Sequence, residues 1–164
     1  MVGGMAGTCS AVDMGLAESA TLSGMAGAYV LTMVRRDAPD RATTVTGPLR
    51  LVARSAGSTT MRGAETPLQG TAALDLEAVG AHRVGSLDST DPSAPGVLVM
   101  EQSGTPPTIM LRLGSGANRT DQVAFDGAFT ALTVRRVSEG MFAGSWRSGV
   151  GMDVTEGYFC AVRR

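Results

Sequence analysis

Few side chains in this sequence could support catalysis or metal binding, and their spacing argues against both. His82 is the single histidine, so a histidine-rich metal site is excluded. Cys9 and Cys160 stand far apart and lack the CxxC or Cys-His spacing of a zinc site. A serine–histidine–aspartate triad of Ser86, His82 and Asp88 would lie within one loop and lacks the Gly-x-Ser-x-Gly elbow. We therefore expect a protein without enzyme activity and without a metal.

Two pairs of carboxylates remain to be explained. Asp75 and Glu77 stand two residues apart, as expected for the solvated face of a half-buried strand. Asp88 and Asp91 either cap a turn before a proline or bind calcium weakly, and no EF-hand spacing supports calcium. The glycine clusters lack the lysine and hydroxyl that cradle a phosphate. The sequence therefore predicts no cofactor.

The two cysteines allow two interpretations. A disulfide between Cys9 and Cys160 would close nearly the whole chain into one loop and stabilise the fold by about 4 to 5 kcal/mol. Alternatively both thiols are reduced, and Cys160 packs as a small hydrophobic side chain. Both interpretations stay open from the sequence.

The composition indicates one β-rich domain. The chain has 164 residues, 43% of them hydrophobic but only 4% aromatic, so Val, Leu, Ala and Met must fill the core. Its 22 glycines without a collagen-like period indicate many turns and short strands. A formal charge of −1 provides no field to gather nucleic acid or an anionic membrane.

The longest apolar run covers residues 25–34, about half the length that a membrane-spanning helix needs. The N-terminus has neither the basic region nor the continuous apolar region of a signal peptide. A start assigned too late or a removed leader would give the same sequence. The location therefore stays open, with a periplasmic or other extracytoplasmic one favoured.

Hydrophobicity alternates every second residue after a leading arm. Residues 1–23, rich in Gly, Ala and Met, are interpreted as an extended arm, and residues 24–164 as one β-barrel or β-sandwich. Closure of the sheet would also remove exposed strand edges. The expected fold is an all-β antiparallel barrel or sandwich of eight or nine strands, at residues 28–35, 45–54, 71–79, 97–102, 108–113, 122–125, 128–136, 140–147 and 156–163.

This pattern resembles the lipocalin- and avidin-like β-barrels. The resemblance depends on the strand count, Gly27-Ala28-Tyr29 at the start of the first strand, Gly144-Ser145-Trp146 in a late strand, and arginine at the end of the last strand. Lipocalins usually carry tryptophan where Tyr29 stands. The resemblance implies a one-ended barrel that holds a small apolar ligand, in a cavity lined by Tyr29, Phe129, Phe142 and Trp146.

Three predicted strands end on two consecutive arginines, and all 14 basic residues of the chain are arginine. Such pairs either prevent edge pairing of strands or form forks for carboxylates and phosphates of a partner. Exposed methionines in the arm would also suit a protein contact. The candidate partner-binding residues are Met5, Met14, Arg35, Arg36, Arg135, Arg136, Arg163 and Arg164.

Two functions follow as expectations. The first is a non-catalytic accessory or scaffolding subunit that docks on other protein chains, including the extramembrane face of a membrane complex, without spanning the membrane itself. The second is a lipocalin-like carrier of a small apolar ligand. A ligand-sized apolar cavity would favour the carrier.

Overall fold

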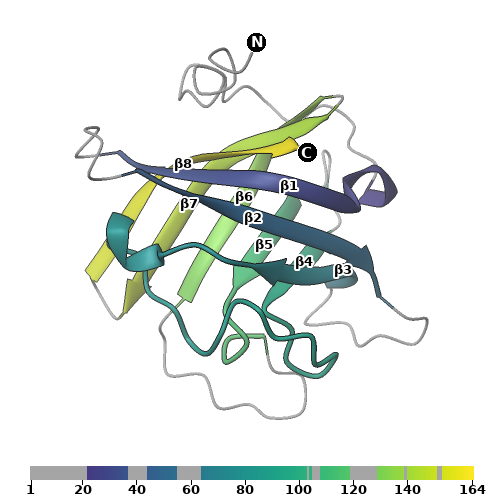
Figure 1. The fold of residues 1–164 in the computed structure, drawn as a ribbon, viewed down its shortest axis with the longest axis horizontal. Helices are drawn as coiled ribbons and strands as arrows, with labels where there is room; N and C mark the ends of the chain where they lie inside the picture. The colour runs from purple at the N-terminus through teal and green to yellow at the C-terminus, as the bar shows by residue number, and fades with distance from the viewer. Residues whose placement is uncertain are drawn as a thin grey trace.

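The structure is a computed structural model, which describes residues 22–36, 44–54, 64–102, 104, 108–118, 129–138, 140–150 and 153–164. Within these residues, eight antiparallel strands form one closed barrel in sequence order, and β8 pairs with β1 (Figure 1). This confirms the all-β antiparallel barrel; the short strand expected at residues 122–125 lies outside the described residues. The strands are β1 (Gly27–Arg35), β2 (Thr44–Ala53), β3 (Ala64–Ala72), β4 (Val97–Gln102), β5 (Thr108–Leu113), β6 (Phe129–Ser138), β7 (Met141–Val150) and β8 (Asp153–Arg163).

Alternating residues of the strands face the barrel interior. In β1, Tyr29, Leu31 and Met33 are buried at 2% exposure or less, as the alternation predicts. The other strands contribute mainly Leu, Val and Phe to the same core. Polar and small side chains alternate with them on the outer wall, which is the usual arrangement of a closed antiparallel sheet.

The sequence-based assignment of the third strand is wrong. Residues 55–69 read as a polar loop and residues 71–79 as a strand, but β3 covers Ala64–Ala72. The pairing of β3 with β4 shifts register between Glu65 and Leu68, and Pro67 lies at that irregularity. Proline is tolerated at such a bulge because it has no N–H to donate to the ladder. The polar composition and the proline together concealed the strand.

A short 3₁₀ helix stands where the prediction continued that strand. Helix η4 (Leu76–Val79) is capped by the Asp75 side chain, whose Oδ1 accepts a hydrogen bond from the Glu77 N–H at 3.2 Å. Leu76 and Val79 are both buried, at the three-residue spacing of a 3₁₀ helix rather than the two-residue spacing of a strand. Asp75 and Glu77 therefore do not share a strand face.

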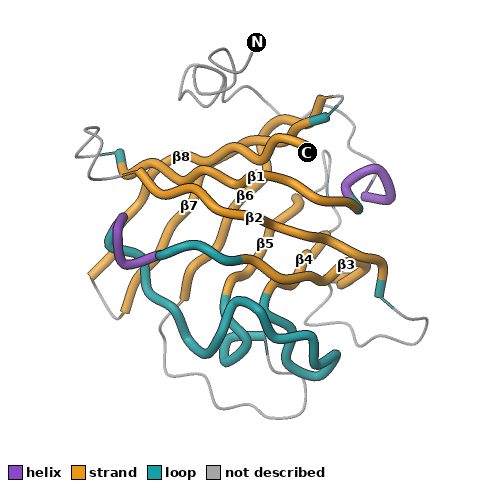
Figure 2. Tube along the Cα trace, in the orientation of Figure 1, coloured by secondary structure: helices purple, strands orange, loops and turns teal. Residues whose placement is uncertain are grey.

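The two helices of the described residues lie at opposite ends of the barrel (Figure 2). Helix η2 (Leu22–Met25) precedes β1 and brings Met25, which is 1% exposed, into the core. Helix η4 and the segment after it reach the other end, where Leu76, Val79, Ala81 and Leu87 join the same core. We call these the η2 end and the η4 end. The described chain thus contributes apolar side chains to the core at both ends.

One close approach inside the barrel requires glycine. Trp146 on β7 donates its indole N–H to the carbonyl oxygen of Val34 on β1 at 3.0 Å, across the intervening β8. A Cβ on Gly157 would lie 1.9 Å from that oxygen and 2.8 Å from the indole nitrogen. Glycine on β8 therefore allows the tryptophan to bridge three strands.

Candidate functional site

Two of the four aromatic residues expected to line a cavity, Tyr29 and Phe142, pack on each other. Tyr29 and Phe142 meet edge to face with ring centroids 5.0 Å apart, and Phe142 and Phe159 at 6.1 Å. Trp146 is completely buried. Phe129 is only half-buried and lies outside the core cluster, because the adjacent Thr130 takes the inward position. Three of the four expected lining residues thus share the interior, and the fourth faces outward.

The exposed fractions of the inward side chains describe how this interior is filled. Leu31, Met33, Trp146 and Phe159 are each 0% exposed, and Phe142 is 1% exposed. A side chain inside a barrel would show exposed area if a water-sized space lay against it. Protein interiors are close-packed in this way, with few voids larger than a water molecule. The space around these residues is therefore occupied by the chain itself.

Arg163 closes the η2 end. Its guanidinium donates to the carbonyl oxygens of Gly24 at 2.7 Å and Ala26 at 3.1 Å, and to the Tyr29 hydroxyl at 3.0 Å. Its Cζ also lies 5.0 Å from the centroid of the Tyr29 ring. The Tyr29 hydroxyl in turn donates to the Met25 carbonyl at 2.8 Å. One strand-end arginine, predicted to bind a partner, thus fixes η2 onto the barrel.

Burial raises the pKa of the Tyr29 hydroxyl above its usual value near 10, and the positive charge and hydrogen bond of Arg163 oppose this only in part. Tyr29 is therefore neutral at physiological pH. In that form its hydroxyl donates to Met25 while it accepts from Arg163.

The arginines at the end of β1 are also engaged within the chain. Arg36 lies 3.5 Å from the Glu156 carboxylate, and Arg147 lies 3.9 Å from the same carboxylate. Arg35 is half-buried, with a guanidinium nitrogen 3.0 Å from where a Cβ on Gly80 would stand. Because β1 and β8 are antiparallel neighbours, this pair lies at the opposite end of the barrel from Arg163 and Arg164.

The arginine pair of β6 differs from the other two. The pairing of β6 with β7 shifts register between Val134 and Arg136, so Arg135 is an extra residue in its strand. Gly144 on β7 accommodates this bulge, since a Cβ there would lie 2.9 Å from the Arg135 nitrogen. Both Arg135 and Arg136 are exposed. Two neighbouring guanidinium groups therefore stand on the outer wall, where consecutive residues of a regular strand would face opposite sides.

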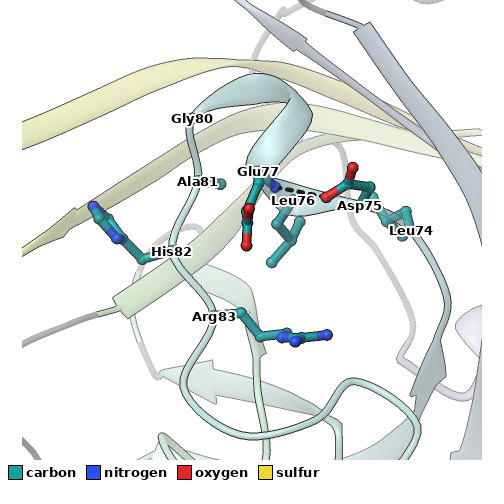
Figure 3. Close-up of a pocket in the computed structure, with 8 residues that line it drawn as sticks. All are labelled: Leu74, Asp75, Leu76, Glu77, Gly80, Ala81, His82 and Arg83. Carbon is teal, nitrogen blue, oxygen red and sulfur yellow. Dashed lines mark hydrogen bonds between the residues drawn. The ribbon is translucent and has the colours of Figure 1, made fainter.

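The η4 end carries a hollow of about 420 Å³. Figure 3 shows the Glu77 carboxylate and the Arg83 guanidinium on the same side of the segment, whereas the His82 imidazole points to the other side. Leu74 and Ala81 add apolar surface. The described residues that line the hollow are Leu74, Asp75, Leu76, Glu77, Gly80, Ala81, His82 and Arg83. Opposite charges and apolar groups together suit a small zwitterionic molecule better than an apolar one.

Two buried hydroxyls attach this segment to the barrel wall. The His82 N–H donates to the Ser148 hydroxyl at 2.7 Å, and the Thr130 hydroxyl donates to the His82 carbonyl. Ser148 and Thr130 lie on β7 and β6, 2.8 Å from each other, and Ser148 also donates to the Phe129 carbonyl at 2.9 Å. We call Thr130 and Ser148 the hydroxyl latch. Among the hydrogen bonds described, those that the hydroxyl latch makes outside β6 and β7 all go to the His82 backbone.

Asp91 serves local structure. Asp91 accepts from the backbone N–H and the hydroxyl of Ser93, both at 2.9 Å, so it caps a turn, one of the two roles predicted for it. In the described part of the chain, no three His, Cys, Asp or Glu side chains gather where they could hold a metal ion. None of the helices in these same residues combines the length and apolarity needed to cross a bilayer.

Cys160 is buried at 2% exposure on β8 and is disulfide-bonded. Cys9, Met5 and Met14 lie outside the described residues, so the pairing of Cys9 with Cys160 stays a prediction at this point. Arg164 is exposed beyond the end of β8, where its backbone N–H donates to the Ala28 carbonyl at 3.0 Å.

Comparison with known proteins supplies no family or neighbour for this geometry. The chain matches no protein-family model, no curated protein and no solved structure. Tyr29 and Arg163, on which the resemblance to lipocalin-like barrels partly depends, are in contact, but the resemblance itself stays a proposal.

Proposed function

We propose that this protein is a non-catalytic accessory or scaffolding protein that docks on another protein through the outer wall of its barrel. The near-zero exposure of the inward side chains carries this proposal. A barrel filled by its own Trp, Tyr, Phe, Leu and Met side chains offers a rigid outer surface rather than an interior binding site.

The arginine pair Arg135 and Arg136 is the docking element that the exposure of the outer wall favours. Both side chains are exposed, and the bulge in β6 puts these two consecutive residues on the same face of the barrel. Guanidinium groups form bidentate hydrogen bonds with carboxylates, so the matching partner surface is acidic. A membrane-bound assembly in the periplasm would be one setting for such a partner.

The experiment compares tagged wild-type protein with a variant carrying Arg135→Glu and Arg136→Glu, each purified from the native host. The matched control is Arg50→Glu, which reverses one exposed arginine on the outer face of β2. We expect a stoichiometric protein partner whose recovery falls at least tenfold with the double variant, survives in the control, and weakens with added salt. Recovery of a lone monomer with a stoichiometric small molecule would refute the proposal.

A second candidate is a carrier whose ligand sits at the η4 end. The specific observation is the hollow of about 420 Å³, a volume within the range of small-molecule sites. Glu77 and Arg83 would bind the two charges of a zwitterion, while the barrel interior stays closed. Native mass spectrometry of the purified protein tests this: a bound mass lost in Arg83→Ala but kept in Arg50→Ala supports the carrier, and no bound mass excludes it.

A further inference from the structure

The outer faces of neighbouring strands differ sharply in exposure. On β2, the outward residues Thr44, Thr46, Pro48, Arg50 and Val52 are all exposed. On β7, β8 and β1, the outward residues around Cys160 are buried or half-buried, and we call six of them the Cys160 patch: Val30, Val34, Ala143, Tyr158, Cys160 and Val162. All these strands are interior members of one closed sheet, so position in the sheet does not explain the difference.

The centre of the Cys160 patch is the most deeply covered. Ala143 and Cys160 are direct partners across β7 and β8, and they are 0% and 2% exposed although both face away from the core. The helices of the described chain stand at the two ends of the barrel, so neither spans this face (Figure 2). This face is mainly apolar, and its hydroxyls belong to Tyr158 and to Thr32, the half-buried partner of Cys160 on β1. Such complete coverage on an outer face indicates that other protein groups pack on it.

The disulfide identifies that piece. Cys160 is disulfide-bonded on the outer face, and the chain has one other cysteine, Cys9. Helix η2 begins at Leu22 beside the end of β8, because the Gly24 carbonyl accepts from Arg163 at 2.7 Å. About 13 residues separate Cys9 from Leu22, and an extended chain of that length spans more than ~40 Å. Cys160 is three residues, or roughly 10 Å, from Arg163.

We propose that residues 1–21 pack across the Cys160 patch and are held there by a disulfide between Cys9 and Cys160. The composition of the segment fits: Met5, Val12, Met14 and Leu16 are apolar and adaptable, and small residues separate them. Its only charges are the acids Asp13 and Glu18, which suits a face bordered by arginines. The inference is independent of docking through Arg135 and Arg136, and it assigns Met5 and Met14 to the chain's own barrel rather than to a partner.

Peptide mapping of the full-length protein without reduction tests the linkage. The first arginine is Arg35, so trypsin leaves residues 1–35 as one peptide and residues 148–163 as another. We expect these two peptides to be joined in each monomer and to separate on reduction. A Cys160–Cys160 link between two copies, or two alkylatable thiols in protein kept oxidised, would overturn the proposal.

Hydrogen–deuterium exchange tests the packing. In the oxidised protein we expect the amides of residues 2–21 to exchange at least tenfold more slowly than in Val162→Glu, which places a charge in the Cys160 patch. Val52→Glu on the uncovered face of β2 is the control and should leave this exchange unchanged, and the fluorescence of Trp146 reports that both variants fold. Exchange of the linked segment at free-peptide rates in the wild type would show a tether without packing and would refute the proposal.

Discussion

The two arginines at the end of β8 make different contacts, although they are neighbours of the same residue type. The Arg163 guanidinium reaches two carbonyl oxygens, one hydroxyl and one ring face, whereas Arg164 contributes a backbone hydrogen bond. We expect Arg163→Ala to lower the free energy of unfolding by about 1 to 3 kcal/mol, since hydrogen bonds from a charged group are lost at a partly exposed site. Urea unfolding followed by Trp146 fluorescence measures the loss.

The controls for this substitution are Arg164→Ala and Arg163→Lys. Arg164→Ala should stay within about 0.5 kcal/mol of wild type, as is usual for exposed side chains. Arg163→Lys keeps the charge but not the planar fork, so it should recover less than half of the loss. Equal stability of Arg163→Ala and wild type would mean that the contacts at the η2 end contribute nothing measurable.

Ionisation of Tyr29 should make the barrel less stable at alkaline pH. Because burial raises its pKa in the folded state above the value near 10 of an unfolded chain, the folded protein keeps the proton longer. Its contribution is therefore fully present below pH 10 and is lost as the pH rises through the folded pKa. In Tyr29→Phe this alkaline loss should disappear, which thermal melts between pH 8 and pH 11.5 would detect as a smaller decrease in Tm.

The hydroxyl latch sets the stability of a single element, the segment that covers the η4 end. In Ser148→Ala the His82 N–H loses its acceptor, so we expect about 1 to 3 kcal/mol less stability and faster exchange of that amide. Ser145→Ala, on the outer face of the same strand, is the matched control and should change neither quantity. Unchanged exchange of the His82 amide in Ser148→Ala would show that the latch does not hold the segment.

The elements that the sequence predicted well are those in which alternation alone decides the structure. In β1, Tyr29, Leu31 and Met33 alternate with outward residues, and no turn residue interrupts them. The prediction of β3 was wrong because Pro67 lies at a bulge, where the two-residue alternation of a strand is interrupted. Helix η4 was predicted as a strand. Its buried residues Leu76 and Val79 are three positions apart, and a short apolar run does not distinguish this spacing from the two-residue spacing of a strand.

The candidate site was harder to predict than the fold. Thr130 and Ser148 occupy inward positions of β6 and β7, but a hydroxyl in an apolar strand is also common on the solvent side. Their role depends on the His82 backbone, which lies 48 and 66 residues away. Likewise, only the folded structure shows that the Arg163 side chain holds η2 whereas the neighbouring Arg164 contributes a backbone hydrogen bond. Pairings between distant segments decide these roles, and local sequence does not contain them.

At the scale of the whole molecule, closure of the sheet puts the N-terminal and C-terminal regions in contact. Strand β1 pairs with β8 along seven residue pairs, and Arg163 holds η2 beside them. The pairing of β1 with β8 joins the strands most distant in sequence, so the chain entropy lost in forming it is large. A covalent link across the same region would remove much of that entropy from the unfolded state.

The disulfide inferred between Cys9 and Cys160 would close a loop of about 150 residues, for which the chain-entropy relation gives about 4 to 5 kcal/mol of stabilisation. Reduction should therefore lower the Tm of the wild type by roughly 10 to 20 °C, at about 2 to 4 °C per kcal/mol for a chain of this size. The double variant Cys9→Ala/Cys160→Ala should melt near the reduced wild type and be insensitive to reductant. Because Ala at position 160 keeps the patch apolar, a double variant that melts with the oxidised protein would show that the link adds no stability beyond packing.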